Sequence, residues 1–358
     1  MKKAMLKILA LTMTMAMAVG GLAGCGKKEE KTKDGYAKEI NFITWDSQYS
    51  EQVFKDFEKK YGIHVNVTYI NNTDELLSKM LNGGADYDLI DIESAYVESF
   101  VKNDLVQKLD KEQIPNYKNF YKECLGVVGD EKNEYTIPAF GKGFTTIIYN
   151  KETCPIKITK FSDLANPKLK NQICMVNSTI SLFGMALQSL GYSAGTNNEK
   201  EIKEAADILT KIKPNVKTFV GSSGENQMLK GECSVGFLWD YTLLMQDKKN
   251  WDKFAIADLE TGSESFMETL AIPKETEKTK EAHLLMNYLS EPEVQAVSIQ
   301  EWGDMPCMDC EKYLPDGYMD NPAFNLPSKF KKAMWMAPVN DKQIELMDKY
   351  YTKFMSEK

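Results

Sequence analysis

Cys25 is the residue whose position most directly predicts a chemical modification. It follows the tripeptide Leu-Ala-Gly at 22–24, which comes after a basic start and a short apolar segment at 8–19. This order is typical of a signal peptide with a small-residue cleavage site. A cysteine directly after Leu-Ala-Gly forms a lipobox, in which the thiol accepts a diacylglyceryl group. We therefore expect a lipoprotein signal peptide over 1–24; an ordinary secretory signal with an incidental cysteine is the alternative.

The remaining reactive side chains form no catalytic motif. Cys307 and Cys310 make a lone C-x-x-C. A redox or zinc site would usually require a second cysteine pair or nearby histidines, so this motif predicts a local disulfide or free thiols. His64 and His283 are the two histidines, and the chain has no G-x-S-x-G, H-E-x-x-H or Walker lysine motif. We therefore do not expect an enzyme, and the sequence predicts no cofactor. The other four cysteines are Cys124, Cys154, Cys174 and Cys233.

Charge limits the ligands that this chain can bind. The formal net charge is −8, and loss of Lys2, Lys3 and Lys7 with the signal peptide makes it about −11. An acidic surface argues against nucleic acid and anionic lipid as partners. All 44 basic residues are lysine, so the chain lacks the guanidinium fork that usually recognises carboxylate or phosphate. An anionic ligand is therefore disfavoured.

The segment after Cys25 predicts a tether. Residues 25–38 are mostly Gly, Lys, Glu, Asp and Thr, and such a segment cannot bury enough apolar surface to offset the entropy of ordering it. The remaining chain, roughly 320 residues, is long enough to form two domains.

Apolar patterns in the first part of the folded chain alternate between strand and helix. Strands are expected over 40–45, 64–70 and 89–92, with helices over 51–61 and from Asn72 to Gly83. This β-α-β-α-β order predicts a parallel sheet with right-handed crossovers, and ligands of such sheets lie beyond the carboxyl ends of the strands. Those ends carry Trp45 with Asp46 and the segment 93–96, which includes Glu93 and Tyr96.

A second alternation follows. Further strands are expected over 144–149, 173–176, 235–239 and 268–272, and further helices over 182–190, 199–212 and 282–289. Chain crossings near residues 140 and 268 predict two α/β lobes around a cleft.

Segments in this order resemble the spermidine/putrescine-binding proteins of polyamine ABC importers, within the extracytoplasmic solute-binding family. The resemblance runs from about residue 40 to 354 and rests on Trp45, 54–62, 85–90, 135–138, 161–164, 185–193, 236–239 and 270–273. It implies an α/β, two-lobed periplasmic-binding-protein fold of type II. The expected boundaries are 39–140 plus 269–305 for lobe 1, and 141–268 plus 306–358 for lobe 2.

The resemblance also implies binding residues. In this family aromatic rings lie along the methylene chain of the polyamine and carboxylates meet its ammonium ends. Trp45 and Trp239 match tryptophans of the family, whereas Glu268 replaces an aspartate and Phe266 replaces a tryptophan.

Other positions depart from the family pattern. A tyrosine of the family aligns with Ala95, although Tyr96 follows, and its C-terminal glutamine aligns near Met336. Two acids of the family align near Ser178 and Ser181, so one acid pair is missing. New acids stand at neighbouring positions: Asp46, Glu93, Asp240 and Asp304.

The resemblance implies a lipid-anchored substrate-binding protein that captures a polyamine or a similar small cation. Its partners would be an ABC permease with its ATPase, and the protein would be a monomer on the extracytoplasmic face of the cell membrane, in the periplasmic space or at the cell surface. The alternative within this class is another solute, such as a different amine, a thiamine-like cation or a metal chelate. A surface enzyme or adhesin is disfavoured by the scarcity of histidine.

Overall fold

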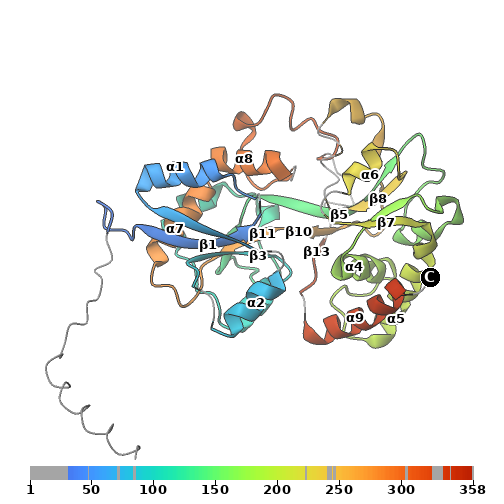
Figure 1. The fold of residues 1–358 in the computed structure, drawn as a ribbon, viewed down its shortest axis with the longest axis horizontal. Coiled ribbons are helices and arrows are strands. Elements are labelled where there is room, and N and C mark those ends of the chain that lie inside the picture. Colours follow the sequence, from blue (N-terminus) through green and yellow to red (C-terminus); the bar gives the residue numbers. More distant parts are fainter. Residues whose placement is uncertain are drawn as a thin grey trace, which may run out of the picture.

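Two lobes lie side by side, each built around its own sheet (Figure 1). The computed structural model describes residues 31–46, 48–70, 73–83, 86–221, 224–239, 244, 247–302, 305–324, 334–338 and 340–356. Cys25 and the rest of the predicted signal peptide lie outside the described residues, as do Asp240 and Asp304 of the predicted site. Within the described part of the chain, no helix is both long enough and apolar enough to cross a membrane.

The first lobe has a five-stranded sheet in the order β2-β1-β3-β11-β4. β1 pairs in parallel with β2 and with β3, as the sequence predicts, whereas β11 is antiparallel to both β3 and β4. The bounds of these strands are Glu39–Trp45 for β1, His64–Ile70 for β2, Leu89–Glu93 for β3, Thr136–Pro138 for β4 and Glu268–Ala271 for β11.

Right-handed crossovers place the helices of this lobe. The chain moves from β1 to β2 in one direction and from β2 past β1 to β3 in the other, so α1 (Glu51–Tyr61) and α2 (Thr73–Leu81) cover opposite faces. α1 buries one stripe of Val53, Phe54 and Phe57, and it ends where Gly62 adopts a left-handed φ of 69°. The reversal of direction makes the carboxyl ends of β1 and β3 a topological switch point, where α/β sheets bind ligands.

The second lobe has an eight-stranded sheet in which the order β13-β10-β5-β8-β6-β7 forms the main path, while β9 and β12 pair with β5. α4, α5 and α9 gather on one side of it in Figure 1. The strand bounds are Gly141–Asn150 (β5), Ile173–Val176 (β6), Val216–Val220 (β7), Val235–Leu238 (β8), Phe254–Ile256 (β9), Glu264–Phe266 (β10), Met305–Pro306 (β12) and Met334–Trp335 (β13).

The helices of the two lobes complete the fold. Beside α1 and α2 they are Val97–Lys102 (α3), Thr179–Ser189 (α4), Glu199–Ile212 (α5), Glu225–Leu229 (α6), Thr279–Leu289 (α7), Pro292–Trp302 (α8) and Asp341–Ser356 (α9). α4 begins three residues before the predicted helix because the Ser178 hydroxyl caps it, accepting a hydrogen bond from the Ser181 amide at 3.2 Å.

The chain passes between the sheets where the sequence predicts. Residues 139–140 link β4 of the first sheet to β5 of the second, and Met267 links β10 of the second sheet to β11 of the first. The lobe boundaries themselves stay a prediction. The six cysteines from Cys124 to Cys310 are free thiols, so no disulfide joins Cys307 to Cys310.

Candidate ligand-binding site

Trp45 and Glu268 meet at the switch point of the first sheet. Trp45 ends β1, Glu268 begins β11, and β3 lies between the two strands. The indole Nε1 of Trp45 donates a hydrogen bond to Glu268 Oε2 at 2.8 Å. The two residues that resemblance assigns to one end of the ligand are therefore direct neighbours, and both side chains are half-buried.

Asp91 lies beside this pair, in the middle of β3, with no exposed surface. Its Oδ2 accepts hydrogen bonds from Thr44 Oγ1 at 2.9 Å and from Gln48 Nε2 at 2.5 Å. Its Oδ1 has no hydrogen-bond donor. Burial raises the pKa of Asp91 to about 7, although hydrogen bonds from Thr44, Glu268 and Gln48 oppose that rise.

Glu93 and Glu268 face each other directly across the antiparallel β3–β11 ladder. Residues opposite in such a ladder project from the same face, and Asp91, two residues before Glu93, shares that face. Burial, followed by the negative charges of Asp91 and Glu93, raises the pKa of Glu268 well above its usual range. Burial and the neighbouring negative charges therefore favour the protonated form of Glu268 over the ionised form, because adjacent buried carboxylates repel each other when both are ionised.

Glu264 is a fourth acid at this junction, and it comes from β10 of the second sheet. It is 5% exposed, and its Oε2 has no hydrogen-bond partner. Burial and then the charge of Glu93 raise the pKa of Glu264 to about 8. Gly184 allows the carboxyl group to lie against α4, since a Cβ atom there would stand 2.7 Å from Glu264 Oε1.

Trp239 lies on the second-lobe side of the junction. Its Nε1 donates a hydrogen bond to Ser181 Oγ at 3.1 Å. Ser181 and Gly184 are three residues apart on α4 and so occupy one face of that helix. A row of contacts therefore runs from Trp45 through the carboxyl groups to α4 and Trp239.

The remaining predicted residues have varied placements. Phe266 is half-buried and its ring lies over Gly143, where a Cβ atom would come within 2.3 Å of the ring Cζ. Asp46 is exposed at the end of β1. Tyr96 is 4% exposed within the core of the first lobe, so its ring offers little surface to a ligand. Met336 is buried, and its amide donates to the Ser265 carbonyl at 2.8 Å.

Sequence reasoning missed Asp91, Glu264 and Gln48 as site residues. Asp91 did carry a signal, because it is an acid inside the apolar strand 89–92, and a buried carboxylate needs a partner. Glu264 carried none, since no strand was expected over 264–266.

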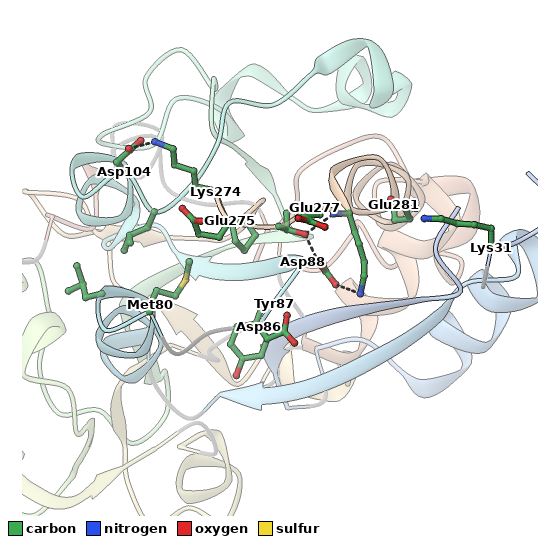
Figure 2. A pocket seen from close by; sticks show the side chains of 16 residues that line it. Lys31, Met80, Asp86, Tyr87, Asp88, Asp104, Lys274, Glu275, Glu277 and Glu281 are labelled. Carbon is green, nitrogen blue, oxygen red and sulfur yellow. Dashed lines mark hydrogen bonds and ion pairs between the residues drawn. The ribbon is translucent and has the colours of Figure 1, made fainter. Parts of the chain in front are cut away.

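One cavity of the described structure lies elsewhere, at the opposite end of the first sheet (Figure 2). Its volume is about 1030 Å³, and its lining includes Asp88, Asp104, Lys274 and Lys278. The described residues contain no group of three or more His, Cys, Asp or Glu side chains arranged to hold a metal ion. Asp88 and Asp104 of this cavity form ion pairs with Lys278 and Lys274, as discussed below.

This combination of two α/β lobes and a polar junction between them defines a solute-binding protein. The chain belongs to the bacterial extracellular solute-binding protein family, whose model matches residues 52–325.

Among named proteins, the chain is similar to the spermidine/putrescine-binding periplasmic protein of Salmonella typhimurium. The two are 28% identical over 319 residues, which are 88% of this chain and 90% of that protein. Two solved structures share the type II fold. The spermidine/putrescine ABC transporter substrate-binding protein PotD of Streptococcus pneumoniae has a TM-score of 0.75 and 21% identity, covering 89% of this chain and 98% of that one. The TpPotD lipoprotein of Treponema pallidum also has a TM-score of 0.75 and 21% identity, covering 88% of this chain and 99% of that one.

Proposed function

We propose that this protein is the substrate-binding component of an ABC importer and captures a polyamine, or a similar small cation, between its lobes. The observation that carries the proposal is that Asp91 and Glu264 are buried and Glu268 is half-buried at the lobe junction, where, within the described residues, the groups that shift their pKa values are acids and neutral donors rather than lysines. Ammonium groups bind strongly to desolvated carboxylates and to the faces of aromatic rings. Trp45 and Trp239 flank these carboxyl groups, and the name of the Salmonella relative agrees with this ligand class.

Binding involves no covalent chemistry in this proposal. The crossings at 139–140 and Met267 act as hinges, the lobes close around the ligand, and the closed form is recognised by a permease with its ATPase. An ammonium group that binds between Asp91 and Glu268 would favour their ionised forms, so we expect ligand binding to release a proton.

The proposal includes a lipid anchor at Cys25, which would hold the protein on the extracytoplasmic face of the cell membrane. One acyl chain anchors only marginally, so two or three chains are expected. Cys25→Ala is expected to abolish incorporation of labelled palmitate and to release the protein or leave its signal peptide uncleaved. Continued labelling of this variant would contradict the anchor.

A thermal-shift screen followed by calorimetry tests the ligand class. We expect putrescine or spermidine to raise the melting temperature as ligand concentration rises. The screen also includes other amines, thiamine and metal chelates, because Ser178 and Ser181 stand where the polyamine-binding family has acids. If only one of these other solutes stabilises the protein, the polyamine assignment is wrong and the solute-binding class remains.

A further inference from the structure

We propose that Glu264, with Glu93 beside it, forms a second ammonium subsite, separate from the one formed by Asp91 and Glu268, so that the protein selects diamines over monoamines. This inference rests on the proposed function and assigns the second cationic end of its ligand. It gives that role to a residue of the second sheet rather than to an acid at a strand end.

The first reason is the unsatisfied polar surface at each subsite. Within the described residues, Glu264 Oε2 is buried without a hydrogen-bond partner, and the carboxyl group of Asp91, whose Oδ2 accepts from Thr44 and Gln48, otherwise meets only another acid, Glu268. A buried polar atom without a partner costs free energy, and more so if the group is ionised. An ammonium group has three N–H donors and a positive charge, so one such group at each position satisfies both the missing hydrogen bond and the missing charge.

The second reason is that the carboxyl groups fall into two sets. Asp91 and Glu268 interact directly with each other, whereas the acid that acts on Glu264 is Glu93. Glu93 acts on both Glu264 and Glu268, and so it lies between the two sets. Two centres of negative potential joined by a shared acid suit a ligand with two positive ends.

The third reason is the spacing along one segment of chain. Glu264 and Glu268 are four residues apart, and extended residues at i, i+2 and i+4 share a face. Their Cα atoms are therefore roughly 13 Å apart in an extended segment, with Phe266 between them on that face. A diamine that spans the two carboxyl groups would therefore pass Phe266, whose half-buried ring lies over Gly143.

The fourth reason is Gly184. The carboxyl group of Glu264 lies so close to α4 that even a methyl group at position 184 would collide with it. The glycine thus permits a carboxylate on the second sheet to lie against α4, on the helix face that carries Ser181, which accepts a hydrogen bond from Trp239. This arrangement brings the second subsite to the side of the junction opposite Trp45.

Calorimetric titration with putrescine and with n-butylamine tests this assignment, because the two ligands have the same chain length and differ in one ammonium. The wild type is expected to bind putrescine at least ~30-fold more tightly than butylamine. Glu264→Gln is expected to weaken putrescine binding by at least ~30-fold and butylamine binding by less than about 3-fold. Glu281→Gln is the matched control, since Glu281 is also a buried glutamate, 7% exposed, but accepts a hydrogen bond from the Ala37 amide at the far end of the sheet.

The outcomes separate the two levels of the proposal. Equal losses for both amines in Glu264→Gln, or no loss for either, overturn the second subsite while the proposed function stands. A wild type that binds neither amine overturns the proposed function itself. If Glu264→Gln does not fold, Glu264→Asp replaces it: a shorter carboxylate is expected to reduce the preference for putrescine, and an unchanged preference contradicts the assignment.

Discussion

Two acidic regions of this molecule differ in how their carboxylates are satisfied. In the cavity of Figure 2, Lys278 lies 3.3 Å from Asp88 Oδ2, and Lys274 pairs with Asp104. Asp88 also accepts hydrogen bonds from the Asn41 amide at 2.8 Å and from Thr276 Oγ1 at 2.5 Å. At the lobe junction, by contrast, the groups of the described part of the chain that act on Asp91, Glu264 and Glu268 include other acids and no lysine.

This contrast teaches that a high density of acids does not by itself make a cation site. The cavity at the far end of the sheet supplies its own cations and donors, so a ligand would have to displace them. The junction gives Asp91 and Glu268 neutral hydrogen-bond donors but, among the described groups that act on them, no positive charge. The junction is therefore the better candidate for a cationic ligand.

The largest expected effect is the loss of ligand binding in Glu268→Gln. Removing one charge partner in a desolvated site costs about 2–5 kcal/mol, or roughly 30- to several-thousand-fold in affinity. Asp104→Asn removes an acid of the Figure 2 cavity and is expected to leave binding unchanged. Calorimetry with putrescine measures the affinity of both variants. Equal affinities for Glu268→Gln and the wild type would contradict the claim that the acids of the junction bind the ligand.

The next effect is the pH dependence of stability without ligand. The pKa of Glu264 is raised to about 8 and that of Asp91 to about 7. Groups whose pKa is higher in the folded state stabilise the fold fully at pH values below their unfolded pKa, near 4, and lose that contribution as pH rises through 7 and 8. Each pKa unit corresponds to ~1.4 kcal/mol.

Chemical denaturation at several pH values between 5 and 9 measures this loss. The free energy of unfolding of the wild type is expected to fall relative to that of Glu264→Gln as pH rises. Saturating putrescine is expected to remove most of the difference between the two proteins in how steeply the free energy of unfolding changes with pH. Parallel pH curves for the two proteins without ligand would show that Glu264 is not the strained acid proposed here.

A smaller effect is expected from Gly184→Ala. The added methyl group would stand 2.7 Å from Glu264 Oε1, so the carboxyl group or α4 must shift, and overpacking of this kind costs about 1–3 kcal/mol. We expect roughly tenfold weaker putrescine binding. Gly195→Ala is the control, because a Cβ atom there meets its nearest neighbour at an ordinary 3.6 Å. Unchanged affinity in Gly184→Ala would place the ligand away from α4.

The smallest effect is expected from Trp239→Phe. This change keeps an aromatic face but removes the hydrogen bond from Nε1 to Ser181. A neutral hydrogen bond contributes about 0.5–1.5 kcal/mol, which corresponds to roughly 2- to 10-fold in affinity. A loss as large as that of Glu268→Gln would indicate that the second lobe, and not the carboxyl cluster, dominates binding.

The sequence predicts the fold well where local patterns are strong. The strand 64–70, the helices 51–61 and 199–212 and the strand 173–176 have the predicted bounds, because each combines clear periodicity with a defined end. The two-residue and three-residue strands β10, β12 and β13 were not predicted. Such short strands exist through pairing with β5 and with each other, and pairing between distant segments leaves no periodic pattern.

The candidate site is only partly predictable for the same reason. Trp45 and Glu268 were identified through resemblance, and their hydrogen bond joins residues 223 positions apart in the chain. Asp91 stands out in the sequence only as an acid in an apolar strand, and Glu264 becomes notable only once Gly184 and Glu93 are seen beside it. Burial and proximity across two lobes, rather than residue type, distinguish these acids from the many on the surface.

A crystal structure with putrescine tests the central claim most directly. We expect one ammonium of the ligand within hydrogen-bond distance of Glu268 or Asp91, the other within hydrogen-bond distance of Glu264 or Glu93, and the alkyl chain across Phe266. A ligand bound in the cavity of Figure 2, or bound at the junction with neither ammonium near these carboxyl groups, would contradict the claim that the acids of the lobe junction define the site.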